Sequence, residues 1–372
     1  MAYVSAPCLI LPNMQNQDQD QDHKTSTGGS VMNLSQKKLY ESKNRLKGLV
    51  DDAWCVGSSE GFLVSLDQDG EPLLVDPFSS TRIKLPSFPS IIGQSHFFKE
   101  MSKIFISKAV MLCDSVHFTR YCRFSIVIIY GSQDKLVFCQ SLNKIWIELP
   151  GAERSYCDII FSRGTLFALS NNGSVEGWDF SGKKPVKFFD IDPCAEICGE
   201  EIRNFPEDEY TVRLYLVESL GELLLVKRFI EDFVNPDGEV LKRDDNVKVE
   251  VSKDSYSLDF PYRTKHFSLY KLDMEYRVGR EKVLWRKIES LNDQVLFLGR
   301  NESASVSAQA FPQCEANSIY FTDDGCNEMY ENDLYGGHDV GVFSVQDRSI
   351  TPLIPYKMIY PPPFWVVPTL RN

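Results

Sequence analysis

The sequence predicts an all-β protein: a single kelch-like β-propeller of six or seven four-stranded antiparallel blades, covering residues 8–370. Three observations support this fold. Short strand-like runs dominate the chain, one pattern recurs about every 51 residues, and apolar runs near the two ends can pair with each other. With 372 residues, 43% of them hydrophobic, the chain can bury a core of this size.

The strand-like runs are short, rich in Val, Ile, Phe and Tyr, and separated by Gly, Asp, Asn and Ser, as in antiparallel hairpins. They lie at 62–66, 73–75, 124–130, 136–139, 145–149, 159–161, 166–169, 212–217, 223–229, 267–272, 295–298, 319–322 and 342–345. An open pair of β-sandwich domains remains an alternative, because it also uses short strands at regular spacing. However, no linker rich in Pro, Gly or Ser divides the chain, which favours one ring.

A Gly or Asn precedes four comparable strands, at Gly61, Gly164, Gly221 and Asn317. The gaps of 103, 57 and 96 residues fit two, one and two units of about 51 residues, close to the length of a kelch-type propeller blade. We expect the repeated positions to serve the scaffold. They are Gly61, Asp76, Pro77, Gly164, Trp178, Asp179, Gly221, Asn317 and Trp365.

A second pattern supports the repeat. Residues 76–86 and 141–150 each form a turn into an outer strand that ends in Leu-Pro. The tryptophans recur at strand ends, and we expect them to pack between sheets. Pairing of the terminal strand 365–368 with residues 8–11 would close the ring.

Two segments interrupt the pattern. Residues 13–30, which contain the run QNQDQDQD, form a polar low-complexity loop, and residues 231–259 form a charged insertion. We expect both to lie outside the propeller core.

Composition excludes several classes of function. The net charge of -12 does not favour binding to nucleic acid, and no apolar run approaches the roughly 20 residues that span a bilayer. The N-terminus has neither a secretory signal nor an Arg-rich transit peptide. We therefore expect a monomer in the cytoplasm, the nucleus or both, with its ten cysteines reduced.

The candidate sites are weak. Cys194 and Cys198 have a four-residue spacing, but no second Cys or His pair lies near them in sequence to complete a zinc site. His338 lies beside two glycines that would permit close approach of a ligand, so it is a weak candidate for binding, although a hydrogen-bonded loop histidine explains it equally simply. The sequence contains no GxSxG, P-loop or GxGxxG motif, and we expect no catalytic residue, metal or cofactor.

Several segments resemble, in the same order, the plant KIB-type β-propeller family, a domain of unknown function found in F-box and kelch-like plant proteins. The matching segments are 55–64, 74–78, 83–86, 158–161, 164–169, 215–219, 221–226, 296–299, 317–324 and 364–368. Together they extend over nearly the whole chain, so the resemblance implies the same propeller.

In that family the propeller usually follows an F-box, and the pair resembles a substrate receptor of a Skp-cullin-F-box ubiquitin ligase. Only about seven residues precede the first strand-like run here, and Leu11-Pro12 leads into a polar run that cannot form an apolar helix face. The resemblance thus implies a protein-binding module that recognises an unknown target and does not itself bind a Skp-type adaptor. The alternative is a propeller enzyme or carbohydrate binder with a polar pocket on the central channel.

Overall fold

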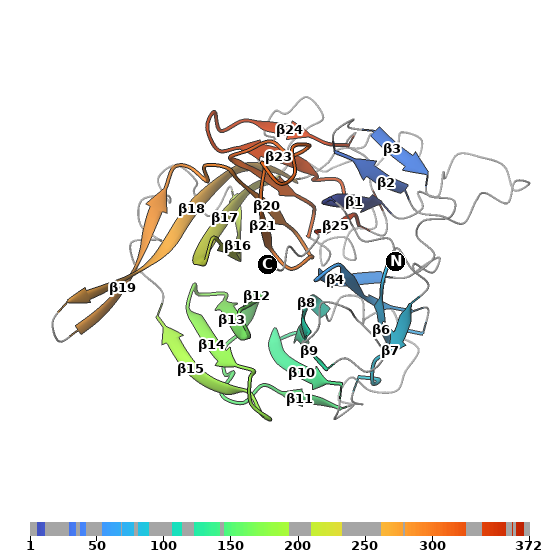
Figure 1. Cartoon of the computed structure of the whole chain (residues 1–372), viewed down its shortest axis with the longest axis vertical. Helices are drawn as coiled ribbons and strands as arrows, with labels where there is room; N and C mark the ends of the chain where they lie inside the picture. Colours follow the sequence, from blue (N-terminus) through green and yellow to red (C-terminus); the bar gives the residue numbers. More distant parts are fainter. Residues whose placement is uncertain are drawn as a thin grey trace, which may run out of the picture.

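The computed structural model describes residues 6–11, 30–34, 38–41, 54–67, 69–77, 81–88, 106–113, 123–141, 145–192, 210–232, 262–277, 280–324, 337–354, 359 and 362–367. In this part of the chain every regular element is a β-strand, and the strands form six sheets around a central axis (Figure 1). The predicted all-β propeller is therefore confirmed, with six blades among the described residues.

Each sheet is one blade, with its first strand at the axis and its last strand at the rim. Blade 1 comprises β25 (Phe364–Val366), β1 (Cys8–Leu11), β2 (Ser30–Asn33) and β3 (Lys38–Glu41). Blade 2 comprises β4 (Trp54–Ser59), β5 (Phe62–Leu66), β6 (Pro72–Val75) and β7 (Arg82–Lys84). Blade 3 comprises β8 (Ile106–Cys113), β9 (Phe124–Tyr130), β10 (Lys135–Gln140) and β11 (Trp146–Glu148).

Blades 4 and 5 have the same order. Blade 4 comprises β12 (Tyr156–Ser162), β13 (Thr165–Ser170), β14 (Val175–Asp179) and β15 (Val186–Ile191). Blade 5 comprises β16 (Tyr210–Ser219), β17 (Glu222–Asp232), β18 (Tyr262–Arg277) and β19 (Arg280–Ile288), and its last two strands extend beyond the ring as a two-stranded ribbon (Figure 1).

Blade 6 departs from the predicted four antiparallel strands. It has five, in the order β21 (Ala304–Ser307), β20 (Gln294–Leu298), β22 (Ser318–Phe321), β23 (Gly341–Ser344) and β24 (Ile350–Pro352). β20 pairs with β22 in parallel, because the chain places β20 beside β22 and then turns back at the axis to add β21 as the innermost strand.

The repeated glycines lie in equivalent turns between the first two strands of blades 2, 4 and 5. Both residues of each turn have positive φ, with values near 50° and then 80 to 83°, as in the tight hairpin turns that require Gly at the second position. The three turns are Glu60-Gly61, Arg163-Gly164 and Leu220-Gly221.

Asn317, with a φ of 55°, precedes β22 in blade 6. The interval of 96 residues from Gly221 to Asn317 therefore covers one blade and not the two that we predicted. The segment between β17 and β18 and the additional strands β20 and β21 account for the extra length.

The Leu-Pro ends of β7 and β11 connect neighbouring blades. The Trp146 Nε1 of blade 3 donates to the Pro86 carbonyl at 2.8 Å, and the Trp178 Nε1 of blade 4 donates to the Pro150 carbonyl at 2.8 Å. The repeated Leu-Pro pattern thus supplies acceptors for a buried tryptophan of the next blade.

The ring closes between the two ends of the chain. β1 pairs with β25, with Leu9 opposite Trp365, as the apolar terminal runs predicted. Trp365 is fully buried, and its ring lies 5.1 Å from that of Phe297 and 5.8 Å from that of Tyr320 in blade 6. Within the described residues, one apolar cluster fills each of the six contacts between neighbouring blades.

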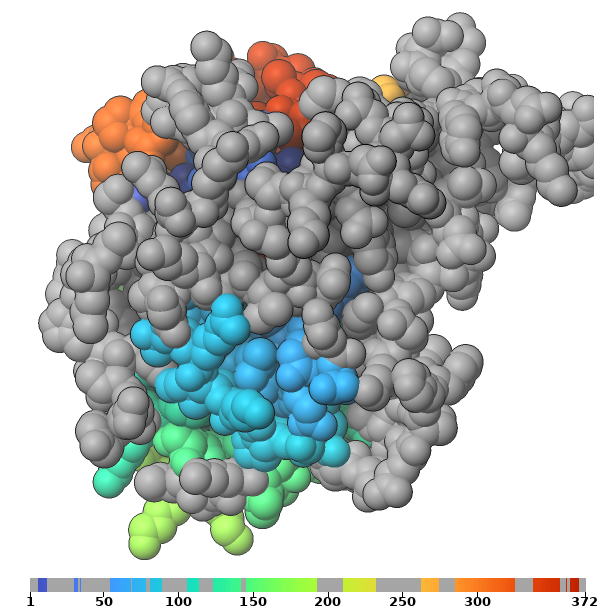
Figure 2. All heavy atoms as spheres, turned by 90° about the vertical axis from the view of Figure 1, so that its right-hand side faces the viewer, coloured from blue at the N-terminus to red at the C-terminus, as the bar shows by residue number. Residues whose placement is uncertain are grey.

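Viewed from the side, blade 2 forms a continuous part of the surface between blades 1 and 6 above and blades 3 and 4 below (Figure 2). The predicted polar loop 13–30 lies outside the described residues except for Ser30 in β2, and the predicted insertion 231–259 does so except for Glu231 and Asp232 in β17. Among the described residues, no helix is long and apolar enough to cross a membrane.

Candidate functional site

The centre of the ring is occupied by the chain itself. Residues 299–303, the axial segment, join β20 to β21 and reach across the axis to blades 2 and 3. The Glu302 N–H donates to the Ser58 carbonyl at 2.7 Å, and the Arg300 Nη2 donates to the Ile106 carbonyl at 2.9 Å. The sequence predicted an open or plugged channel equally well, and the structure shows it crossed by this segment.

A buried ion pair lies beside the axial segment. Lys108 of β8 and Asp158 of β12, with 4% and 0% of their surfaces exposed, form a close ion pair, and the Ser303 hydroxyl donates to Asp158 at 3.4 Å. The backbone N–H groups of Ile159 and Leu216 donate to the two oxygens of Asp158 at 2.8 and 2.7 Å. Burial raises the pKa of Asp158, although the Lys108 ammonium opposes the rise. Three blades thus meet at one carboxylate.

Glu302 forms a second link across the axis. Its carboxylate accepts a hydrogen bond from the Ser59 hydroxyl of blade 2 and another, at 2.8 Å, from the Phe161 N–H of blade 4. Burial raises the pKa of Glu302 to about 7, with a further increase from Glu60 and a decrease from Lys108. A carboxyl group of this kind can exchange a proton near neutral pH.

Several polar atoms near the start of the axial segment lack hydrogen-bond partners within the described structure. Arg300 is 4% exposed, and its guanidinium lies 5.4 Å from the Trp54 ring, but its Nε and Nη1 have no acceptor. Asn301 Oδ1 and Thr322 Oγ1 are also without partners and flank Gly299, where a Cβ would lie 2.1 Å from Thr322 Oγ1.

This arrangement suits structure and recognition better than catalysis. Asp158 and Glu302 are the carboxyl groups at the axis, and each is held by hydrogen bonds from the chain. Within the described residues, no group of three or more His, Cys, Asp or Glu side chains could hold a metal ion. General acid–base chemistry needs a titratable group within reach of a substrate, and the axial segment occupies that space.

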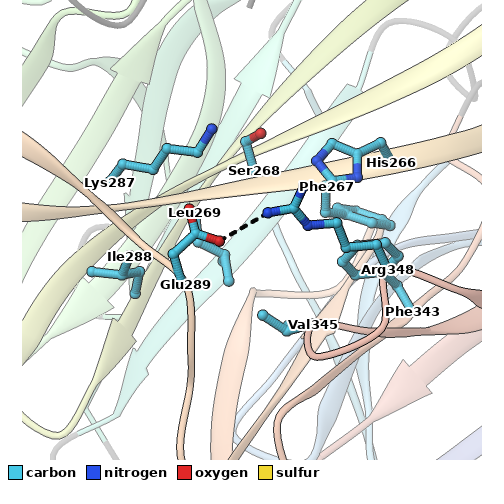
Figure 3. Close-up of a pocket in the computed structure, with 10 residues that line it drawn as sticks. All are labelled: His266, Phe267, Ser268, Leu269, Lys287, Ile288, Glu289, Phe343, Val345 and Arg348. Carbon is cyan, nitrogen blue, oxygen red and sulfur yellow. Dashed lines mark hydrogen bonds and ion pairs between the residues drawn. The ribbon is translucent and has the colours of Figure 1, made fainter.

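A surface pocket of about 270 Å³ lies between blades 5 and 6, between β18, β19 and the end of β23 (Figure 3). Its lining combines apolar side chains with a charged rim and consists of His266, Phe267, Ser268, Leu269, Lys287, Ile288, Glu289, Phe343, Val345 and Arg348. Glu289 and Arg348 form an ion pair of 3.1 Å between exposed side chains (Figure 3). Exposed pairs contribute little stability, so a ligand could displace this one at low cost.

The structure places His338, the weak binding candidate, inside the protein. It is 1% exposed, its ring centroid lies 4.6 Å from that of Tyr262, and its Nε2 is 3.2 Å from the Tyr262 carbonyl. The neighbouring Asp339 accepts from Arg228 Nη2 at 2.9 Å, and Tyr262 donates to Asp323 at 2.7 Å. His338 therefore belongs to a buried network between blades 5 and 6.

Asp324 completes this network. The Tyr215 hydroxyl donates to it at 2.8 Å, and Arg213 and Arg228 lie 3.5 and 3.4 Å away. Although burial acts in the opposite direction, the two guanidinium groups hold the pKa of Asp324 below its usual range. Asp323 and Asp324, which the sequence suggested as turn carboxylates, are thus tied to the core.

Sequence reasoning missed the residues that organise these buried networks, although a signal for three of them is present. Lys108, Asp158 and Arg228 are single charges within apolar strands, in ISKAVML, YCDIIF and LLVKRFI. Buried charges are rare unless they are paired, so each such position indicates an internal partner. Cys194 and Cys198 lie outside the described residues.

Comparison with known proteins identifies the family. The model of the KIB1-4 beta-propeller matches residues 31–344. The chain belongs to this family. The predicted resemblance is therefore confirmed.

Curated relatives of this KIB1-4 propeller protein come from Arabidopsis thaliana. F-box protein SKIP23 is 25% identical over 351 residues, covering 85% of this chain and 77% of the relative. F-box/kelch-repeat protein KIB1 is 25% identical over 323 residues, covering 84% and 68%. Among solved structures, the N-terminal domain of Nup159 covers 91% of this chain and 74% of its own at 13% identity, with a TM-score of 0.35.

Proposed function

We propose that the chain is a protein-binding module of the kind that recognises substrates for plant Skp-cullin-F-box ubiquitin ligases. The observation that carries the proposal is a propeller of the KIB1-4 family whose axis is filled by its own residues 299–303. With the axis filled, a ligand meets loops and blade edges, which are the surfaces that proteins bind. The same observation favours binding over catalysis and over a carbohydrate pocket on the axis.

We expect the target to be a protein and not nucleic acid or a membrane, since the net charge is -12. The propeller itself is not expected to contact a Skp-type adaptor. Its place of action is the cytoplasm or the nucleus.

The blade edges support a monomer. β15 is the outermost strand of blade 4 and exposes Val186 and Phe188, at 61% and 60%. An edge with exposed apolar side chains could pair with another chain, but a register shift beside Gly177 and the positive charge of Lys187 discourage such pairing.

The test is proximity labelling and affinity capture from plant extract with the full chain, using an unrelated propeller with the same tag as the control. Reproducible recovery of a protein partner supports the proposal, and recovery of none contradicts it. Direct capture of purified Skp-type adaptor would contradict the expectation about the adaptor.

Two surface variants then locate the binding face. Phe188→Lys changes the exposed edge of blade 4, and Arg348→Glu changes the rim of the pocket between blades 5 and 6. Both side chains are exposed, so we expect both variants to keep the unfolding midpoint of the original protein. Loss of the partner with only one of them assigns the face.

A further inference from the structure

Arg300 is a buried cation that has no acid of its own. It is 4% exposed, and its described hydrogen bond runs from Nη2 to the Ile106 carbonyl. Its Nε and Nη1 are shielded from solvent and have no acceptor in the described structure. The Trp54 ring, 5.4 Å from the guanidinium, supplies a cation–π contact but no hydrogen-bond acceptor.

The neighbouring carboxylates are already committed elsewhere. Asp158 forms an ion pair with Lys108, and Glu302 accepts hydrogen bonds from β4 and β12. Counting these groups, the charge of Arg300 is the one at the axis without an opposing partner. An unpaired charge in the interior costs several kcal/mol, so such a group normally has an anion beside it.

The guanidinium retains the geometry to bind one. Nη2 carries two hydrogens, one on each edge of the planar group, and the Ile106 carbonyl takes one of them. The other edge keeps two parallel N–H donors, formed by Nη2 with either Nε or Nη1. Such a pair matches the two oxygens of a carboxylate or a phosphate.

We propose that Arg300 anchors an oxyanion, a carboxylate or a phosphate group, at the end of the axis where β4 and β8 begin. The site is the axial segment with Trp54 and Ile106 beside it. If the protein-binding function proposed above holds, the oxyanion is a carboxylate of the partner; free inorganic phosphate is the other source. Because Nε and Nη1 are enclosed, the anion exchanges slowly and is best introduced by refolding.

The experiment compares thermal unfolding midpoints after refolding in phosphate, acetate or chloride at equal ionic strength. The variants are Arg300→Gln and, as a matched control, Arg348→Gln, which removes an exposed guanidinium. Binding to the folded state shifts the midpoint upward. We expect phosphate, acetate or both to raise the midpoint of the original protein and of Arg348→Gln, but not that of Arg300→Gln.

A purely structural role predicts a different result. In chloride, the site proposal expects Arg300→Gln to be at least as stable as the original protein, because the variant removes an unpaired buried charge. Arg300→Lys keeps the charge but not the two-donor edge, so it should fold and lose most of the response. An unchanged anion response in Arg300→Gln or Arg300→Lys, or no response in the original protein, overturns the proposal.

The partner capture separates the two sources. Loss of the partner with Arg300→Gln but not with Arg348→Gln assigns the carboxylate to the partner. Retention of the partner, together with loss of the phosphate response, assigns the site to a free anion. An anion response without any recovered partner contradicts the protein-binding function and leaves the anion site standing.

Discussion

Glu302 combines a carboxyl group of unusual acidity with contacts to two distant blades. Its pKa rises on folding from the ordinary 4.5 to about 7, chiefly because it is buried. The folded protein therefore holds a proton that the unfolded chain has already released between these two pH values. The free energy of unfolding should consequently decrease as the pH rises from about 4.5 to about 7.

Replacing Glu302 with Gln tests this behaviour. The amide keeps one acceptor for the Phe161 N–H and one donor for the Ser59 hydroxyl, but it cannot ionise. We expect Glu302→Gln to lose stability relative to the original protein at pH 5 less than expected for a core change, and to become relatively more stable at pH 8. Urea unfolding midpoints at the two pH values measure this difference. The exposed control Glu289→Gln should show the pH dependence of the original protein; the same dependence in Glu302→Gln would contradict the assignment.

At the scale of elements, close approach of β4 to β8 depends on Gly57. The register of β4 shifts between Cys55 and Gly57, and a Cβ at Gly57 would lie 2.2 Å from the Ala109 carbonyl oxygen. Because the obstacle is backbone, neither strand can move without disturbing the cluster between blades 2 and 3.

We expect Gly57→Ala to reduce the free energy of unfolding by about 1–3 kcal/mol, the usual cost of overpacking. Ser65→Ala is the matched control in the same blade: the Ser65 side chain is 1% exposed and its hydroxyl has no partner in the described structure. Its removal should be neutral or slightly stabilising. Chemical denaturation of both variants measures the difference, and equal stability would show that β4 and β8 can separate freely.

At the scale of the whole molecule, the ring is held by a short strand at the end of the chain. Trp365 is completely buried between blades 1 and 6, and β25 supplies the innermost strand of blade 1. Its loss would leave a cavity and weaken the pairing that closes the ring.

Trp365→Ala should therefore cost about 3–5 kcal/mol, as large-to-small changes of buried aromatic residues do. Phe188→Ala removes an aromatic side chain that is 60% exposed and should change stability by less than about 0.5 kcal/mol. Thermal unfolding and limited proteolysis compare the two variants. A Trp365→Ala protein as stable and resistant as Phe188→Ala would mean that the ring does not depend on its closing strand.

Local sequence determined much of this architecture. Positive φ at Gly61, Gly164 and Gly221 is a local requirement of tight turns, so these positions revealed the repeat. The path of the chain through blade 6 could not be predicted, since the parallel pairing of β20 with β22 depends on contacts across the ring.

The same limit applies to the site. Lys108 and Asp158 could be recognised as charges in apolar strands, but their pairing joins two blades and is set by ring geometry. Arg300 and Glu302 lie in a short polar run that looks like an ordinary turn. Their importance follows from the axis, which exists only after six blades assemble.

The pairing of β1 with β25 also has a consequence for synthesis. Leu11 and Phe364 are separated by about 350 residues, so β1 leaves the ribosome long before its partner is made. At about 5–20 residues per second, the interval is roughly 20–70 s. Throughout it, one edge of the newly made β1 is unpaired and Leu9, Ile10 and Leu11 have not reached their final cover. Chaperone demand during translation is thus built into a ring closed by its last strand.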